Sequence, residues 1–79
     1  MTMTRKEKEC VERILDKDVS LRDKERAIKR LGEFLEETFI LDLLPSNQLK
    51  KALGEIAVSR SVESSLKQKA KSLIKKYRL

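Results

Sequence analysis

The chain has 79 residues, of which 41% are charged and 39% are hydrophobic, and its formal net charge is +6. A chain of this length forms one small domain with one core, which excludes a two-domain enzyme. It contains no histidine and one cysteine, Cys10, so it lacks a Ser-His-Asp or Cys-His nucleophile, an internal disulfide and a Cys/His zinc site. Glu7, Glu9 and Glu12 lie near Cys10 in the sequence and should raise the pKa of its thiol, so we expect an unreactive cysteine. We therefore expect a protein that is not an enzyme and needs no metal or cofactor.

Two helix starts are marked near the beginning of the chain. Thr4 and Ser20 are each followed, three residues later, by a carboxylate, as in a capping box. The first predicted helix ends near Asp16, and the second has a strongly amphipathic pattern over residues 27–36. Gly32 interrupts that pattern at a cost of up to about 1 kcal/mol relative to alanine. Either a neighbouring helix approaches closely at this glycine or the site tolerates it.

The segment 38–44 is apolar enough to be buried. Pro45 restricts the residue before it to extended geometry, so a helix in this segment must be short. We expect the segment to fill part of the core through its large side chains, namely Phe39, Ile40, Leu43 and Leu44.

Two further helices are predicted after the proline. Ser46 caps a helix that ends near Val58, and Ser61 caps a last helix that runs almost to Leu79. Alternation with a period of two, as in a β-strand, is not present. The sequence predicts an all-α fold, a compact bundle of four main helices plus one short helix, in one domain over residues 1–79. It is expected to be a monomer.

Basic residues are concentrated in the second half of the chain. Residues 1–44 hold ten Lys or Arg and eleven Asp or Glu, a balance of −1, whereas residues 45–79 hold nine against two, a balance of +7. On the last helix, four cations lie within about 80° of one another at 100° per residue. These residues, here called the basic ridge, are Lys67, Lys71, Lys75 and Arg78. The ridge is either an ordinary solvated surface or a binding site for an acidic partner.

Two classes of ligand fit a basic ridge. Nucleic-acid binding generally also uses exposed aromatic rings, but we expect Phe34, Phe39 and Tyr77 to lie on core faces. An acidic peptide with an aromatic anchor needs only cations beside a small apolar pocket. The peptide is therefore the first hypothesis and nucleic acid the alternative. The longest apolar run is residues 39–41, far below the roughly 20 residues that cross a membrane, so no membrane association is expected.

Several segments resemble the N-terminal domain of the transcription elongation factor TFIIS, also called the LW domain. Residues 70–77 read Ala-Lys-Ser-Leu-Ile-Lys-Lys-Tyr, which is similar to the end of the family's last helix with tyrosine in place of tryptophan. Upstream, the family has a Leu-Leu pair, a short polar turn and then a helix with a characteristic pattern. The same order is found at residues 43–44 and 49–56, although Lys50 stands where the family has glycine. The resemblance covers roughly residues 8–78.

The resemblance implies a non-catalytic, nuclear docking module of the transcription elongation machinery. Such domains bind short disordered motifs in which an aromatic or aliphatic anchor is flanked by acidic residues. They are usually the N-terminal domain of a longer protein. In the family, the binding pocket lies where the first interhelical loop meets the loop before the last helix. By position, four side chains would line that pocket, with core burial as the alternative for each: Val19, Leu21, Val58 and Val62.

Overall fold

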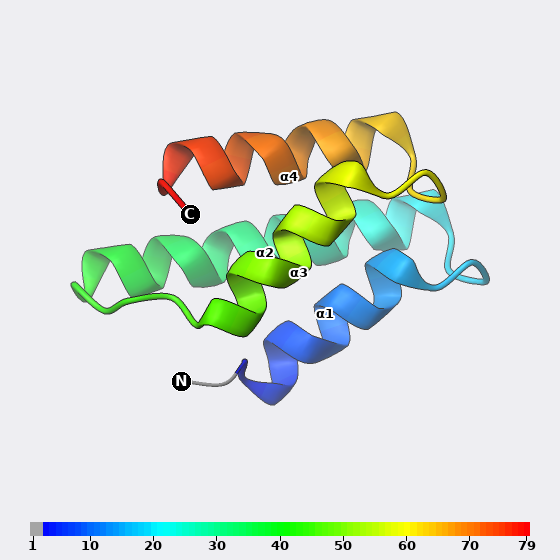
Figure 1. Cartoon of the computed structure of the whole chain (residues 1–79). Helices are drawn as coiled ribbons and strands as arrows, with labels where there is room; N and C mark the ends of the chain where they lie inside the picture. Colours follow the sequence, from blue (N-terminus) through cyan, green and yellow to red (C-terminus); the bar gives the residue numbers. More distant parts are fainter. Residues whose placement is uncertain (1–2) are drawn as a thin grey trace.

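The computed structural model describes residues 3–79, which form four α-helices and no strand (Figure 1). The predicted all-α class is confirmed for this part of the chain, and the first two residues of the predicted domain lie outside it. The helices are α1 (Arg5–Leu15), α2 (Leu21–Ile40), α3 (Asn47–Val58) and α4 (Ser64–Lys76).

Polar caps open the first three helices, as predicted. At α1 the Thr4 hydroxyl accepts a hydrogen bond from the Glu7 backbone N–H at 3.2 Å, and the Glu7 carboxylate accepts one from the Thr4 N–H at 3.1 Å. This is a complete capping box, which satisfies two free amides at once. The hydroxyls of Ser20 and Ser46 each accept from the N–H three residues further on, at 3.3 and 3.1 Å. The predicted starts of α2 and α3 are therefore confirmed, but only the Ser20 half of the capping box predicted at α2 is present.

The predicted start of the last helix at Ser61 is wrong. Helix α4 begins at Ser64, and its N-cap residue, Glu63, makes no side-chain capping hydrogen bond. The Ser61 hydroxyl lies 3.0 Å from the hydroxyl of Ser59 in the preceding turn, where it caps nothing. The Glu63 side chain instead forms an ion pair with Lys24 of α2.

Helices α2 and α4 end in the same way. In each, a residue in the left-handed conformation follows the C-cap: Asp42 at φ 56° and Arg78 at φ 54°. The next N–H then donates back to a carbonyl of the last helical turn, at 2.9 Å in both cases. This pattern is a Schellman motif, which usually has glycine at the left-handed position. It ends α4 at Lys76, short of the predicted end near Leu79.

The predicted short helix over 38–44 is also wrong. Helix α2 continues to Ile40, and residues 43–46 are irregular. The four side chains expected to fill the core are exposed, namely Phe39, Ile40, Leu43 and Leu44. Helix α2 has 20 residues and its neighbours have 11 to 13, so at 1.5 Å per residue it is about 30 Å long against about 20 Å or less. Its last turn extends beyond the core.

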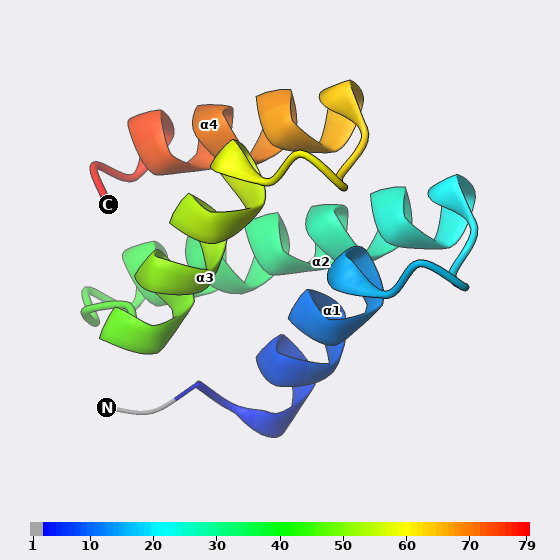
Figure 2. The same cartoon turned by 45° about the vertical axis from the view of Figure 1, so that its right-hand side comes forward.

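Two helical hairpins pack against each other to form the bundle. The most extensive contacts join α1 to α2 and α3 to α4, and the hairpins meet through α2 with α4 and α1 with α3. Helices α2 and α4 lie side by side and run in the same direction (Figures 1 and 2). The Cα radius of gyration is 11.5 Å, close to the roughly 11.6 Å expected of a compact chain of this length. The largest fully buried side chains are Ile14, Ile28, Leu31, Leu35, Leu49, Leu53, Ile56 and Leu66.

The two glycines have different surroundings. A Cβ added at Gly32 would stand 3.2 Å from Cδ2 of Leu73 on α4, so a neighbouring helix does approach closely there. A Cβ added at Gly54 would meet nothing within 4 Å. Both glycines have ordinary helical backbones, so neither is required by a positive φ.

We predict that Gly54→Ala raises the free energy of unfolding by about 0.5 to 1 kcal/mol, since it gains helix propensity and meets no neighbour. Gly32→Ala should gain less or lose stability, because Leu73 must move by a few tenths of an ångström. Urea unfolding of both variants provides the comparison. Equal stabilisation by the two substitutions would contradict the close approach of α4 at Gly32.

Candidate functional site

The loop between α1 and α2 and the loop between α3 and α4 lie at the same end of the bundle (Figures 1 and 2). An ion pair connects this end: the Lys24 ammonium lies 3.4 Å from a carboxylate oxygen of Glu63. The Lys24 side chain is only 5% exposed, whereas that of Glu63 is 40% exposed. The other Glu63 oxygen is buried and has no hydrogen-bond partner among the described residues. The start of α2 is therefore tied to the start of α4 by a largely buried charge.

The four predicted pocket residues are found in this region but in different environments. Val19 is partly buried and Leu21 is exposed. Val58, at the end of α3, is 77% exposed, whereas Val62 is 4% exposed and belongs to the hydrophobic core. The Val62 side chain is thus packed away from any surface ligand. The structure brings the two loops together as expected, but it does not present all four side chains on one surface.

We predict that Glu63→Ala lowers the free energy of unfolding by about 1 to 3 kcal/mol, because it leaves the Lys24 ammonium buried without its partner. The same substitution in a Lys24→Met background should cost much less, since no buried charge is then left. Thermal or urea unfolding of the two single variants and the double variant measures the coupling. The same cost in both backgrounds would contradict a stabilising ion pair.

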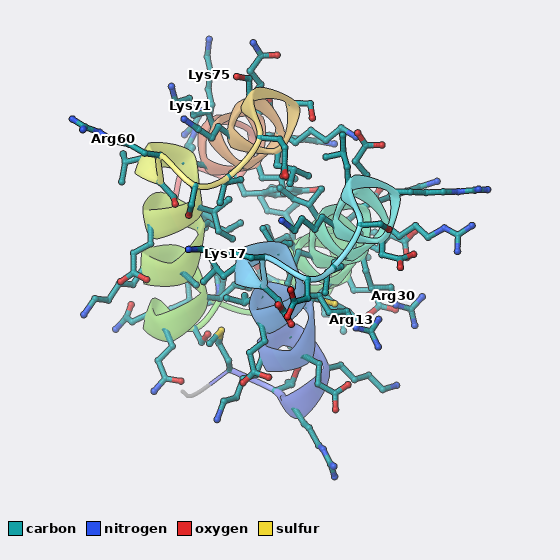
Figure 3. The ribbon with its side chains drawn as sticks, turned by 90° about the vertical axis from the view of Figure 1, so that its right-hand side faces the viewer. Arg13, Lys17, Arg30, Arg60, Lys71 and Lys75 are labelled. Atoms are coloured by element: carbon teal, nitrogen blue, oxygen red, sulfur yellow. The ribbon has the colours of Figure 1, made fainter. Side chains whose placement is uncertain are left out.

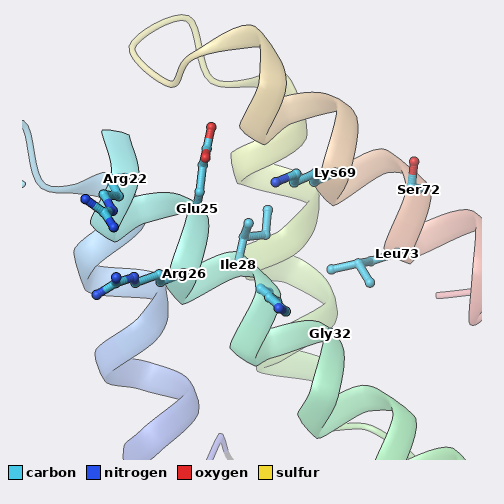
Figure 4. Close-up of a pocket in the computed structure, with 9 residues that line it drawn as sticks. Arg22, Glu25, Arg26, Ile28, Gly32, Lys69, Ser72 and Leu73 are labelled. Atoms are coloured by element: carbon cyan, nitrogen blue, oxygen red, sulfur yellow. The ribbon is translucent and has the colours of Figure 1, made fainter. Parts of the chain in front are cut away.

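A groove of about 500 Å³ runs between α2 and α4 (Figure 4). Its floor is apolar and is formed by Ile28, Gly32 and Leu73. Because Gly32 has no side chain, Leu73 of α4 approaches its backbone closely and closes the groove from the α4 side. Four cations and one carboxylate line the rest together with Ser72: Arg22, Arg26, Lys29, Lys69 and Glu25. The groove is therefore an apolar depression with a basic rim.

The basic ridge lies on the other flank of α4. Lys71 and Lys75 project away from the bundle, on the side of α4 that is nearer to α3 (Figure 3). Lys67 is partly buried and Arg78 is exposed beyond the helix end. None of the four ridge residues lines the groove between α2 and α4, whose cation from α4 is Lys69. The cations of α4 are thus divided between two surfaces.

Sequence reasoning missed the groove, although part of its signal was present. Arg22, Arg26 and Lys29 recur at spacings of four and three residues, which places them on one face of α2. What the sequence did not reveal is that Lys69 faces them across the helix pair, because that depends on how α4 packs on α2.

The aromatic side chains do not all lie on core faces, so that expectation is wrong. Phe39 is exposed, and its ring lies 5.9 Å from that of Tyr77, centroid to centroid, at an interplanar angle of 58°. The Lys76 ammonium lies 5.4 Å from the centre of the Tyr77 ring. Tyr77 is also partly buried against the core. An aromatic pair with a cation beside it is therefore present at the ends of α2 and α4.

Cys10 is buried on α1, as expected for an unreactive thiol. Burial raises the pKa of the thiol above its ordinary value. Arg13 and Arg30 oppose this pKa rise, while Glu9 and Glu7 add to it. The direction expected from the sequence is correct, but burial and not the neighbouring carboxylates is the main cause. A raised pKa lowers the fraction of the reactive thiolate.

We predict that iodoacetamide alkylates Cys10 several-fold more slowly in the folded protein than in urea at about pH 8, because the folded thiol is both buried and protonated. Raising the pH should increase the folded-state rate beyond the pH at which the unfolded rate levels off. Equal rates in the two states at about pH 8 would contradict this environment.

Among residues 3–79, no three His, Cys, Asp or Glu side chains are grouped so that they hold a metal ion. The helices formed by these residues are too short or too polar to span a bilayer. Comparison with protein-family models, characterised proteins and solved structures found no significant match to the chain. The groove between α2 and α4 is therefore interpreted from its own geometry and charge.

Proposed function

We propose that the protein is a non-catalytic docking module that binds an acidic, disordered peptide in the groove between α2 and α4. The observation that supports this most is the composition of the groove, an apolar floor with four cations and one carboxylate around it. This combination is complementary to a peptide whose aromatic or aliphatic side chain is flanked by Asp or Glu.

The two parts of the groove would contribute differently to binding. An apolar anchor that is fully buried on the floor contributes roughly 1.5 to 3 kcal/mol. The rim cations are exposed, so they mainly raise the association rate and select against basic partners. The long stems of Arg26, Lys29 and Lys69 also extend the apolar surface beside the anchor. Binding should therefore require both a buried anchor and flanking acidic residues.

The resemblance to the TFIIS N-terminal domain suggests a cellular location and a class of partner for this activity. If residues 70–77 reflect membership of that family, the module works in the nucleus and its partners are disordered segments of transcription elongation factors. The groove differs in position from the loop pocket that the resemblance implies, so the proposed peptide lies along α2 and α4. The buried Val62 side chain and the Lys24–Glu63 pair favour this placement.

Nucleic-acid binding is the second candidate, and the aromatic pair at the ends of α2 and α4 favours it. Phe39 and Tyr77 offer ring surface beside Lys76, and aromatic stacking next to cations is how single strands are held without sequence preference. Only one ring of the pair is exposed and the rings are tilted, so few bases would stack there. The acidic peptide remains the proposal that the groove supports better.

We predict that Arg26→Glu/Lys69→Glu weakens binding of a short acidic peptide with one central Phe by about tenfold or more, or about 1.4 kcal/mol. Lys71→Glu/Lys75→Glu changes the net charge equally on the ridge and should weaken binding only about twofold to threefold, through the long-range field. Fluorescence anisotropy at about 150 mM salt measures both, with the peptide's Phe→Ser version as the ligand control.

The remaining outcomes separate the alternatives. Lys51→Glu/Arg60→Glu alters two exposed cations outside the groove and the ridge and serves as the protein control. A larger loss from the ridge pair than from the groove pair would place the site on the ridge. Tighter binding of a single-stranded oligonucleotide, lost on Phe39→Ala and not displaced by the peptide, would favour nucleic acid instead.

A further inference from the structure

The end of α2 and the residues after it form an exposed apolar surface. Five consecutive or nearly consecutive large side chains contribute to it, and each is at least half exposed. This surface, here called the α2 tip, comprises Phe39 (69% exposed), Ile40 (73%), Leu41 (66%), Leu43 (51%) and Leu44 (82%). The backbone that carries it lies at one extreme end of the molecule in both views (Figures 1 and 2).

The α2 tip is large for a surface that stays in water. Its five residues together expose on the order of several hundred Å², with Ile40 lining one depression and Leu43 and Leu44 lining another. Exposed apolar patches of this size often mark interaction sites. One side of a standard protein interface covers about 800 Å². The tip therefore offers a substantial part of the area that one partner needs.

Charges of both signs lie near the α2 tip. Lys50 lines a cavity with Leu43 and Leu44. The Lys76 ammonium lies beside the Tyr77 ring that packs on Phe39.

The chain segment that forms the tip is itself acidic. Residues 31–49 contain four carboxylates and no Lys or Arg, and three of these carboxylates flank the tip directly, at Glu36, Glu37 and Asp42. All three are exposed. A partner for this surface must supply apolar contacts together with positive charge.

We infer that the α2 tip of one molecule binds the groove between α2 and α4 of a second copy. The tip is an acidic, aromatic and aliphatic segment, which is the ligand chemistry that the groove's apolar floor and four cations fit. This inference rests on the proposed function, because it assigns a specific occupant to the same groove. It departs from the monomer that we expect from the sequence.

Other ways of covering the tip fit the charges and the geometry less well. Joining two tips symmetrically would place the carboxylates at Glu36, Glu37 and Asp42 of both copies against one another, which is unfavourable. A molecule cannot fold its own tip into its groove, because the groove involves residues 22–32 of α2 and the tip is the other end of that rigid helix. Two copies that each insert their tip into the other's groove close as a dimer. A single tip-to-groove contact leaves a free tip and a free groove, through which longer assemblies form.

Two variants test this arrangement when they are measured alone and mixed. Ile40→Ser/Leu44→Ser removes two exposed side chains of the tip and leaves every charge in place. Arg26→Glu/Lys69→Glu reverses two groove cations and leaves the tip intact. The weight-average mass is measured by sedimentation over a series of concentrations. The weight-average mass of wild type should exceed that of a monomer at high concentration, and added salt should reduce this mass.

Each variant alone should remain monomeric, whereas an equimolar mixture should form a heterodimer and go no further, because only one intact tip and one intact groove remain. Lys51→Glu/Arg60→Glu should associate like wild type and controls for net charge. Dimerisation of the groove variant alone would show a tip-to-tip contact and overturn the inference. Wild type that stays monomeric at the highest concentration would also overturn it.

A separate measurement on the tip variant keeps the two proposals distinguishable. Because its groove is intact, it should bind the acidic Phe peptide as tightly as wild type does at low concentration. Peptide binding by a protein that never self-associates would reject the inference and leave the docking function standing. Self-association that requires the groove, in a protein that does not bind the peptide, would support the contact between copies and reject the wider docking function.

Discussion

The absence of a side chain at Gly32 determines how closely α4 can lie against α2. Leu73 Cδ2 is only 3.2 Å from the position that a Cβ would take, so even alanine would require an adjustment. Because α1 packs on α2 and α3 packs on α4, this approach helps to join the two hairpins of the bundle. Gly32 and Leu73 are also part of the groove floor. The packing of the core and the shape of the candidate site therefore depend on the same contact.

The unequal lengths of the helices account for the second notable surface. Helix α2 has 20 residues, whereas the helices packed around it have 11 to 13. Its N-terminal part is covered by α1 and α4 and contributes to the basic groove, while its C-terminal end carries apolar side chains past the core. One long helix thus joins a basic, concave surface to an apolar, protruding one.

The parts of the fold that depend on local interactions were predictable from the sequence. Thr4, Ser20 and Ser46 cap the helices that begin after them, because a capping hydrogen bond needs only residues three positions apart. Whether residues 38–44 are buried could not be predicted in this way, because an apolar run is buried only if another element packs over it. The end of α2 was also not recognised from the sequence, because Asp42 takes the left-handed conformation at a position where glycine is usual.

The candidate site was likewise predictable only where it depends on local sequence patterns. The cations on each helix were visible as faces of a helical wheel, but which faces meet depends on packing between residues about 40 positions apart in the chain, such as Lys24 and Glu63 at 39 positions. Reasoning from sequence therefore placed the cationic part of the binding surface on the ridge, and the resemblance placed the apolar part at the two interhelical loops. The structure adds an apolar floor to the other flank, and that floor is what an anchored peptide requires.

The docking site is tested most directly by a ¹⁵N-resolved NMR titration of the protein with the acidic Phe peptide. The two glycine amides are useful reporters, because Gly32 lies on the groove floor and Gly54 lies on α3, outside the groove. The groove proposal predicts that the signals of Gly32, Lys69 and Ser72 shift together and saturate with one affinity, while that of Gly54 stays in place. Shifts confined to the ridge or to the interhelical loops, with Gly32 unchanged, would contradict it.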